Sequence, residues 1–285
     1  VNRLNIYRIS RKADQIVWHQ LGRIFNIYLI IELLLLLIRY IPDGLLVLLL
    51  GVLSVTITHA YVVTSLKLID HREQDICLKD AFVGIFEFVR LFPAYIMRKV
   101  SLNVISFLLV IPTILYLASQ SGISVGDFLS WVRLIVVDGL ENLTYMLDNS
   151  FLAESWQVML SMLVSSVISA ILSYGLAMVP YLIERYDVSW NEAMMKSWKM
   201  MKGHKRDLLF LQLIYIPRYL IYLIMINFAS LLVPATTAFG LAVQLALAIY
   251  LPITLWVPHL QVATALFYEE LIHQSGPQDS RIFEL

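Results

Sequence analysis

The sequence has little charge and almost no cysteine. Asp, Glu, Lys and Arg make up 15% of its 285 residues, against about 25% in a typical soluble domain. The 21 basic and 21 acidic residues cancel, so no bulk charge attracts nucleic acid. The single cysteine, Cys77, cannot form an internal disulfide. These shortages argue against a soluble domain, a nucleic-acid-binding protein and a disulfide scaffold.

The sequence also lacks the short motifs that carry well-known chemistries. It contains no nucleophile elbow, zinc-protease motif, phosphate-binding loop or Cys-x-x-Cys. His71, Glu73 and Asp75 are close in sequence, but such a group is more typical of a solvated polar loop than of a metal site. We therefore expect no enzymatic activity, no cofactor and no metal.

Long apolar runs dominate what is present. Hydrophobic residues make up 59% of the chain, and the mean hydropathy is +0.75. About 20 apolar residues cross a bilayer core of about 30 Å. Six runs come close to this length: Ile24–Ile41, Leu45–Ser65, Val100–Ala118, Val158–Ile183, Leu208–Ser230 and Phe239–Val262. The sequence thus predicts an all-α integral membrane protein with six transmembrane helices.

The links between the runs predict hairpins and an orientation. Pro42-Asp43-Gly44 is a turn sequence between the first two runs, and a short link around residues 234–237 joins the last two. Most of the 21 Lys and Arg residues fall on one side of this arrangement. The positive-inside rule places that side, with both termini, in the cytoplasm, and leaves residues 119–157 as the outer loop.

Repeated proline motifs predict three related units. Ile-Pro recurs at Pro112 and Pro217, and Val-Pro-ring-Leu recurs at Pro180 and Pro258. Each cytoplasmic segment also carries an early alanine; the three are Ala13, Ala81 and Ala193. We expect a single membrane domain over 1–285, built from hairpin units that are each preceded by a cytoplasmic amphipathic helix. The units cover about 1–66, 67–183 and 184–275, followed by a polar tail over 276–285.

The segment before the fifth run predicts a helix on the inner membrane surface. Ser189 and Glu192 fit a capping box, and Gly203 suits the C-terminal stop. Trp190 and Trp198 fall on one face of the helix, and a second face carries Lys196, Lys199 and Lys202. A basic amphipathic helix of this kind lies in the membrane interface. Packing of the two tryptophans against the bundle, with solvated lysines, is the alternative.

Glu32, Arg218 and His59 are the candidate site residues inside the apolar runs. Glu32 and Arg218 lie at similar estimated depth with opposite charge, and His59 lies in the inner half of the second run. Ionisable residues in a span are costly and usually face the bundle interior or a wet cavity. We predict a Glu32–Arg218 ion pair, which either fixes the packing of two units or belongs to a substrate or proton site with His59.

Motifs in the last third resemble those of a known family. They are Met201-Lys202-Gly203-His204-Lys205, Trp256-Val257-Pro258-His259 and Phe267-Tyr268-Glu269-Glu270-Leu271. They resemble an uncharacterised family of polytopic membrane proteins common in Firmicutes, in which tyrosine is usual where His259 stands. The layout is more distantly similar to the membrane domain of some glycerophosphodiester phosphodiesterases. The resemblance implies a bacterial plasma membrane and supplies no catalytic residue.

Two functions fit these observations best, and a membrane-embedded enzyme is a third alternative. One is a membrane protein that handles a lipid or small amphiphile, in transport or membrane homeostasis, with membrane lipids as its partners. The other is a scaffold or accessory subunit that binds other membrane proteins. A cavity open to one side favours the first function, and a packed bundle with an exposed groove favours the second.

Overall fold

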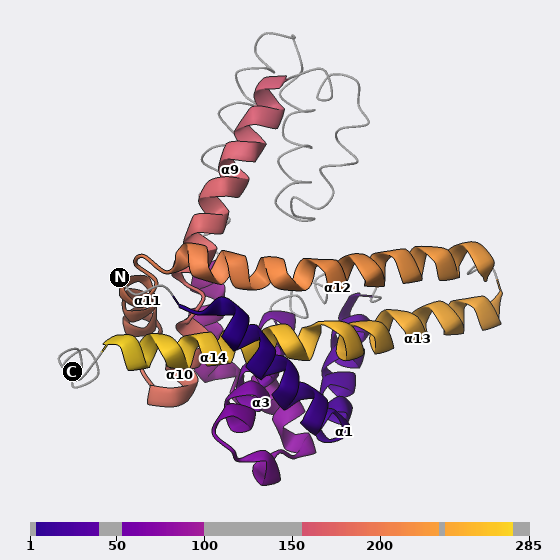
Figure 1. Ribbon diagram of the computed structural model, residues 1–285, viewed down its shortest axis with the longest axis horizontal. Helices are drawn as coiled ribbons and strands as arrows, with labels where there is room; N and C mark the ends of the chain where they lie inside the picture. Colours follow the sequence, from indigo (N-terminus) through magenta and orange to yellow (C-terminus); the bar gives the residue numbers. More distant parts are fainter. Residues whose placement is uncertain (1–3, 40–52, 100–155, 234–236, 276–285) are drawn as a thin grey trace. The chain divides into compact units, whose positions relative to one another are not determined.

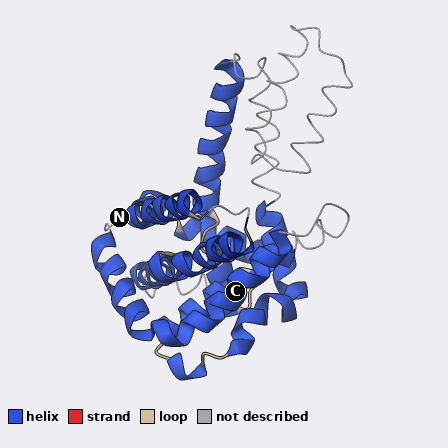
Figure 2. Ribbon diagram, turned by 90° about the vertical axis from the view of Figure 1, so that its right-hand side faces the viewer, coloured by secondary structure: helices blue, strands red, loops and turns tan. Residues whose placement is uncertain are grey.

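The computed structural model describes residues 4–39, 53–99, 156–233 and 237–275, and within these ranges every regular element is helical (Figures 1 and 2). The all-α prediction is therefore confirmed for the described residues. The long helices are α1 (Ile6–Arg39), α9 (Trp156–Gly175), α12 (Lys205–Leu232), α13 (Ala238–Leu255) and α14 (Val257–Ser275). The shorter elements are α3 (His59–Ile69), η1 (Glu73–Asp75), η2 (Leu78–Phe82), α4 (Val83–Phe86), α10 (Val179–Tyr186) and α11 (Trp190–Met200).

The chain divides into two compact units. One comprises residues 1–96 and 174–285, and the other comprises residues 97–173. Of the second unit, the structure describes residues 97–99 and the greater part of α9. The polar sites described below all belong to the first unit.

Four helical segments are long and apolar enough to cross a membrane: Ile6–Ile38, Leu163–Tyr186, Lys205–Leu232 and Phe239–Gln274. They indicate a membrane protein. The second predicted run appears as a shorter apolar helix, Leu53–Ile69. The predicted turn at 42–44, the third run over 100–118 with Pro112, and the outer loop up to residue 155 lie outside the described residues.

Three apolar helices are interrupted before a buried ring. The helix 53–69 is interrupted at Thr58, and α3 begins at His59. Residues 176–178 separate α9 from α10, and α13 ends before Trp256, after which α14 begins. Pro180 and Pro258 stand at the second position of α10 and α14, where the missing N–H has no helical partner to lose. The rings that follow, on His59, Tyr181 and His259, are buried.

The core lies where α1 and α3 pack against α14 (Figure 1). Tyr28, Phe267 and Tyr268 are among its largest fully buried side chains. Each of the three early alanines, Ala13, Ala81 and Ala193, is also completely buried. Small residues at such positions let helix backbones approach closely.

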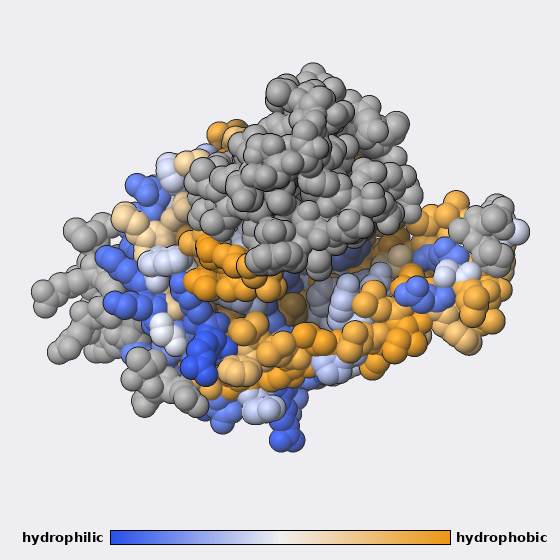
Figure 3. Space-filling view, turned by 90° about the horizontal axis from the view of Figure 1, so that it is seen from above, coloured by the Kyte–Doolittle hydropathy of each residue, from blue (hydrophilic) through white to orange (hydrophobic). Residues whose placement is uncertain are grey.

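The hairpin of α12 and α13 exposes apolar side chains. Phe228 is 59% exposed and Leu231 is 79% exposed near its tip, where apolar residues dominate the surface (Figure 3). An exposed apolar surface of this extent is unusual in a soluble monomer. It suits contact with lipid chains.

Candidate functional site

Three polar sites lie within the apolar bundle. The Asp14 triad consists of Asp14, Arg218 and His259. The His59 cluster consists of His59, Glu87, Arg90, Tyr95, Glu184 and Asp187. The Glu32 cavity is a hollow bordered by α1, α3, α12, α13 and α14, and its wall includes Glu32 and Tyr61.

Arg218 pairs with Asp14 and not with Glu32. Its two terminal nitrogens donate to the two carboxylate oxygens of Asp14 at 2.9 and 2.7 Å. This bidentate geometry is the strong form of an arginine–carboxylate pair. The predicted Glu32–Arg218 pair is therefore wrong. Equal depth along two helices does not fix which sides of the helices face each other, and α1 begins at Ile6, so Asp14 is already inside a helix.

His259 completes the Asp14 triad. Its Nδ1 lies 2.7 Å from Oδ1 of Asp14, and the imidazole is completely buried. Trp18 packs edge-on against it, with ring centroids 5.2 Å apart. The triad thus joins α1, α12 and α14 through one carboxylate.

Glu32 instead meets Tyr61. The Tyr61 hydroxyl donates to Oε1 of Glu32 at 2.7 Å. Both residues line a cavity of about 590 Å³. The other lining residues are apolar or aromatic, apart from one amide: Leu35, Leu36, Tyr219, Tyr222, Ala248, Ile249, Pro252, Trp256, Val257, Leu260 and Gln261. Among the described residues that line the cavity, none is basic, and Glu32 is the one charged group.

The aromatic wall of the Glu32 cavity is organised. Tyr219 packs edge-on against Trp256, with ring centroids 5.4 Å apart, and lies 6.0 Å from Tyr222. The interruption before α14 places Trp256 at this wall, because α13 ends one residue before it. A carboxylate beside aromatic faces can bind a cation by charge and by the quadrupoles of the rings.

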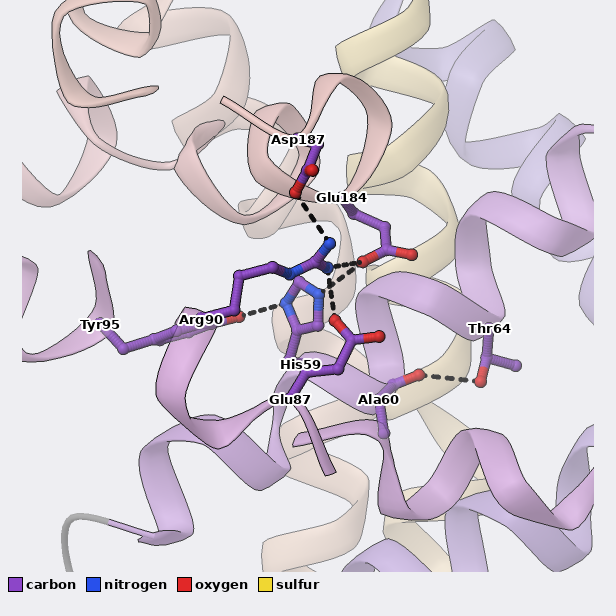
Figure 4. A network of polar contacts seen from close by, with 8 residues as sticks. All are labelled: His59, Ala60, Thr64, Glu87, Arg90, Tyr95, Glu184 and Asp187. Carbon is purple, nitrogen blue, oxygen red and sulfur yellow. Dashed lines mark hydrogen bonds and ion pairs between the residues drawn. The ribbon is translucent and has the colours of Figure 1, made fainter. Parts of the chain in front are cut away.

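His59 bridges three helical segments (Figure 4). Its Nδ1 lies 2.9 Å from the hydroxyl of Tyr95 in the helical segment 88–99. Its Nε2 lies 3.0 Å from Oε2 of Glu184 in α10. Arg90 donates to that same oxygen at 3.0 Å and to Asp187 at 3.0 Å, and it pairs with Glu87 at 2.5 Å. His59, Glu32 and Arg218 therefore belong to three separate sites.

The helix α11 has its predicted N-cap, but Lys196 does not lie on the solvated face predicted for it. The Ser189 hydroxyl accepts from the backbone N–H of Glu192, which is one half of the predicted capping box. Trp190 and Trp198 are exposed together with Lys199 and Lys202, whereas Lys196 is 7% exposed and pairs with Glu192 one turn earlier. Lys196 is therefore not part of a solvated basic face, because its stem lies on the side of α11 that is buried. Location of this helix at the membrane surface stays a prediction.

Sequence reasoning missed Asp14, Arg90 and Glu184. All three lie outside the six predicted apolar runs, so the sequence did not identify them as partners of Arg218 and His59. The useful signal was helical spacing. Asp14 follows Ser10 by four residues, and Ser10 is also buried and donates to the hydroxyl of Tyr215 in α12. The polar stripe of α1 therefore faces α12.

Within the described residues, no three His, Cys, Asp or Glu side chains are grouped in a way that would hold a metal ion. A family model described as "Protein of unknown function (DUF975)" matches residues 2–275. No curated protein and no solved structure matches the chain. The distant similarity to glycerophosphodiester phosphodiesterases stays a prediction.

Proposed function

The chain belongs to the DUF975 family of unknown function, and from this premise we propose that it is a non-enzymatic membrane protein that handles a lipid or small amphiphile. Its setting is a bacterial plasma membrane, with six spans and both termini in the cytoplasm. The single observation that carries this proposal is the Glu32 cavity.

The chemistry of the Glu32 cavity suits an amphiphile. Its volume of about 590 Å³ lies in the usual range of about 300–1,000 Å³ for small-molecule sites. Leu35, Leu36 and Ile249 offer an apolar surface for a chain, and Glu32 with Tyr61 offers one polar end. The apolar lining favours burial of the ligand's hydrocarbon chain, and the carboxylate interacts with its head group.

The preferred head group carries a positive charge. Glu32 is the one charged residue of the described lining, and Tyr219, Tyr222 and Trp256 add aromatic faces. An ammonium group satisfies both features, because it neutralises the carboxylate and is attracted to the rings by about 0.5–2 kcal/mol. An anionic head group would meet only repulsion from Glu32.

The proposed three-unit repeat is consistent with this function. It is supported by the three interrupted helices, each followed by a buried ring at His59, Tyr181 or His259. Two of these interruptions border or adjoin the Glu32 cavity, because Tyr61 and Trp256 line it. Discontinuous helices of this kind form the substrate sites of many transporters.

Native mass spectrometry with two probes tests the proposal. We expect the purified protein to retain dodecyltrimethylammonium in preference to dodecyl sulfate. Glu32→Gln should weaken that retention at least about tenfold, which corresponds to about 1.4 kcal/mol. Glu270→Gln is the matched control, because Glu270 pairs with Arg8 and does not line the cavity. Equal binding by the Glu32→Gln variant and the unmodified protein would refute the site.

The scaffold alternative predicts a different spectrum. A protein that binds other membrane proteins would carry the mass of a second subunit after gentle solubilisation, and it would show no preference between the two probes. The same experiment therefore separates the two functions.

A further inference from the structure

Contacts on its buried side hold α11 in one orientation. The Ser197 hydroxyl donates to the carbonyl oxygen of Gly175 at 2.8 Å and accepts from the backbone N–H of Met178 at 3.2 Å. Ala193, Ser197 and Met201 on this side are completely buried. These contacts fix α11 against the interruption before α10, so the side chains on its other side face outward.

The outward side of α11 combines apolar and basic side chains. Met195 is 55% exposed and Trp198 is 42% exposed. Lys199 and Lys202 are exposed within about one turn of Trp198 in the sequence. Aromatic and basic side chains on one exposed helix face are typical of a helix that lies in a membrane interface.

A glycine allows Trp198 and Lys205 to meet. A Cβ atom on Gly175 would lie 2.3 Å from the Trp198 ring and 3.3 Å from Nζ of Lys205. That Nζ atom lies 3.6 Å from the centroid of the indole. The missing side chain at Gly175 leaves room for the indole, and the indole holds the ammonium group at the first residue of α12.

The link from α11 to α12 concentrates positive charge. Residues 199–206 contain no acidic residue and four basic ones: Lys199, Lys202, Lys205 and Arg206. We call these four residues the basic corner. The nearest carboxylates are engaged elsewhere, because Glu192 pairs with Lys196 and Asp207 pairs with His204. Among the described residues, no carboxylate forms an ion pair with the basic corner, so its charge is uncompensated there.

An exposed apolar stripe continues from the basic corner along α12. Arg206 is exposed in the first turn of α12, and Phe210 and Leu213 are 49% and 42% exposed. Residues with this spacing share one face of a helix. Ile216 and Leu220 extend the stripe. In a helix long and apolar enough to cross a membrane, such a stripe meets acyl chains, and the basic corner at its end lies at the level of the phosphate groups.

We propose that the basic corner and the apolar stripe bind an anionic phospholipid in the leaflet at this end of α12, where α11 also lies (Figure 1). Lys202 and Arg206 hold the phosphate, Trp198 contacts the glycerol region, and one acyl chain follows Phe210 and Leu213. None of these residues lines the Glu32 cavity. The site is therefore independent of the ligand proposed for that cavity, and it depends on α12 crossing the membrane.

Charge and shape together select this occupant. Four cations favour a head group with net negative charge over a zwitterionic one, and each basic residue near an anionic membrane surface strengthens binding by about fivefold. The apolar stripe favours a ligand with acyl chains over a soluble phosphate compound. Phosphatidylglycerol combines both features.

Native mass spectrometry of the full chain, titrated with lipid in detergent, tests the site. We expect phosphatidylglycerol to bind at least about tenfold more tightly than phosphatidylcholine with the same acyl chains. Lys202→Gln combined with Arg206→Gln should lower the affinity for phosphatidylglycerol at least about tenfold, because two charges are lost. Arg72→Gln combined with Lys79→Gln is the matched control. It removes two exposed charges from another segment, and it should leave the preference unchanged.

Fluorescence quenching in vesicles locates the bound lipid without the double variant. Phosphatidylglycerol with brominated acyl chains should quench Trp198 more than brominated phosphatidylcholine does. The contribution of Trp198 is the difference between the unmodified chain and Trp198→Phe. Equal quenching by the two lipids overturns the proposal, whether or not the double variant folds.

Three further results would overturn the proposal. One is equal affinity for the two lipids, or an unchanged preference in the folded Lys202→Gln, Arg206→Gln variant. Another is binding of glycerophosphoglycerol, the head group without acyl chains, as tightly as the whole lipid, because the site would then serve a soluble phosphate compound. The third is the mass of a second protein subunit in place of lipid, which would assign this surface to a protein partner.

Discussion

Asp14 connects α1 to α12 and α14. Its carboxylate serves Arg218 and His259 together, at 2.7–2.9 Å. The side chains of Asp14 and Arg218 are 24% and 32% exposed, so water screens the pair less than it would a surface pair. Loss of Asp14 leaves the guanidinium and the imidazole without their acceptor.

A double-mutant cycle on thermal unfolding in one detergent tests this dependence. Asp14→Asn and Arg218→Leu should be non-additive by about 0.5–3 kcal/mol, because the two side chains share one interaction. Glu32→Gln and Arg218→Leu should add, because these residues do not meet. Additivity in the first cycle, or coupling in the second, would contradict the described pairing.

For single residues, the sequence identified ionisable side chains in apolar runs better than it identified their partners. Glu32, Arg218 and His59 stood out in the sequence, because ionisable residues in an apolar run are rare. The choice of Asp14 by Arg218, and of Glu184 by His59, depends on helix rotation and on contacts between residues 204 and 125 positions apart. No local pattern encodes those contacts.

At the scale of elements, α4 packs against the interruption before α3. A Cβ atom on Gly84 would lie 2.0 Å from the carbonyl oxygen of Thr56 and 2.7 Å from Cα of Ile57. Both obstacles are backbone atoms, so a side chain cannot simply rotate away. The glycine therefore permits the contact that brings the helical segment of Arg90 and Tyr95 next to His59.

Gly84→Ala should lower the free energy of unfolding by about 1–3 kcal/mol, as overpacking in a core does. Gly22→Ala is the matched control, since a Cβ there meets nothing within 4 Å, and alanine is the better helix former by about 0.5–1 kcal/mol. Thermal unfolding of the two variants, measured side by side, checks the prediction. Equal stability would show that the backbone contact at Gly84 is not tight.

Element ends were predictable where the local chemistry is strong. The Ser189 cap and Gly203, which has φ of 92°, mark the segment of α11 as expected. Pro258 marks the start of α14, whereas Pro217 lies inside α12 and does not end that helix. A proline is tolerated inside an apolar helix as well as in its first turn, so proline alone does not place the end of a helix.

For the whole molecule, the predicted topology has both termini in the cytoplasm. In a Cys77→Ser background, a cysteine at Asn149 should react with a membrane-impermeant maleimide applied to intact cells, and one at Ser280 should not. The unmodified chain is a control, because Cys77 is expected to be cytoplasmic and therefore unreactive. Labelling at Ser280 without labelling at Asn149 would reverse the orientation.

The sequence predicted the class of the molecule because class follows from composition and run length. Helical structure and four apolar helices long enough to span a membrane agree with that expectation. The tertiary arrangement of the helices could not be predicted from the sequence. It depends on α1 joining α14 and α12, which stand at the opposite end of the chain.

The members of the Asp14 triad are synthesised at widely separated times. His259 leaves the ribosome 245 residues after Asp14, a delay on the order of 10–50 s at typical rates of synthesis. Until Arg218 and then His259 are synthesised, the carboxylate of Asp14 lacks these partners. We therefore expect chains truncated before α14 to be degraded faster than the full chain, because they lack His259.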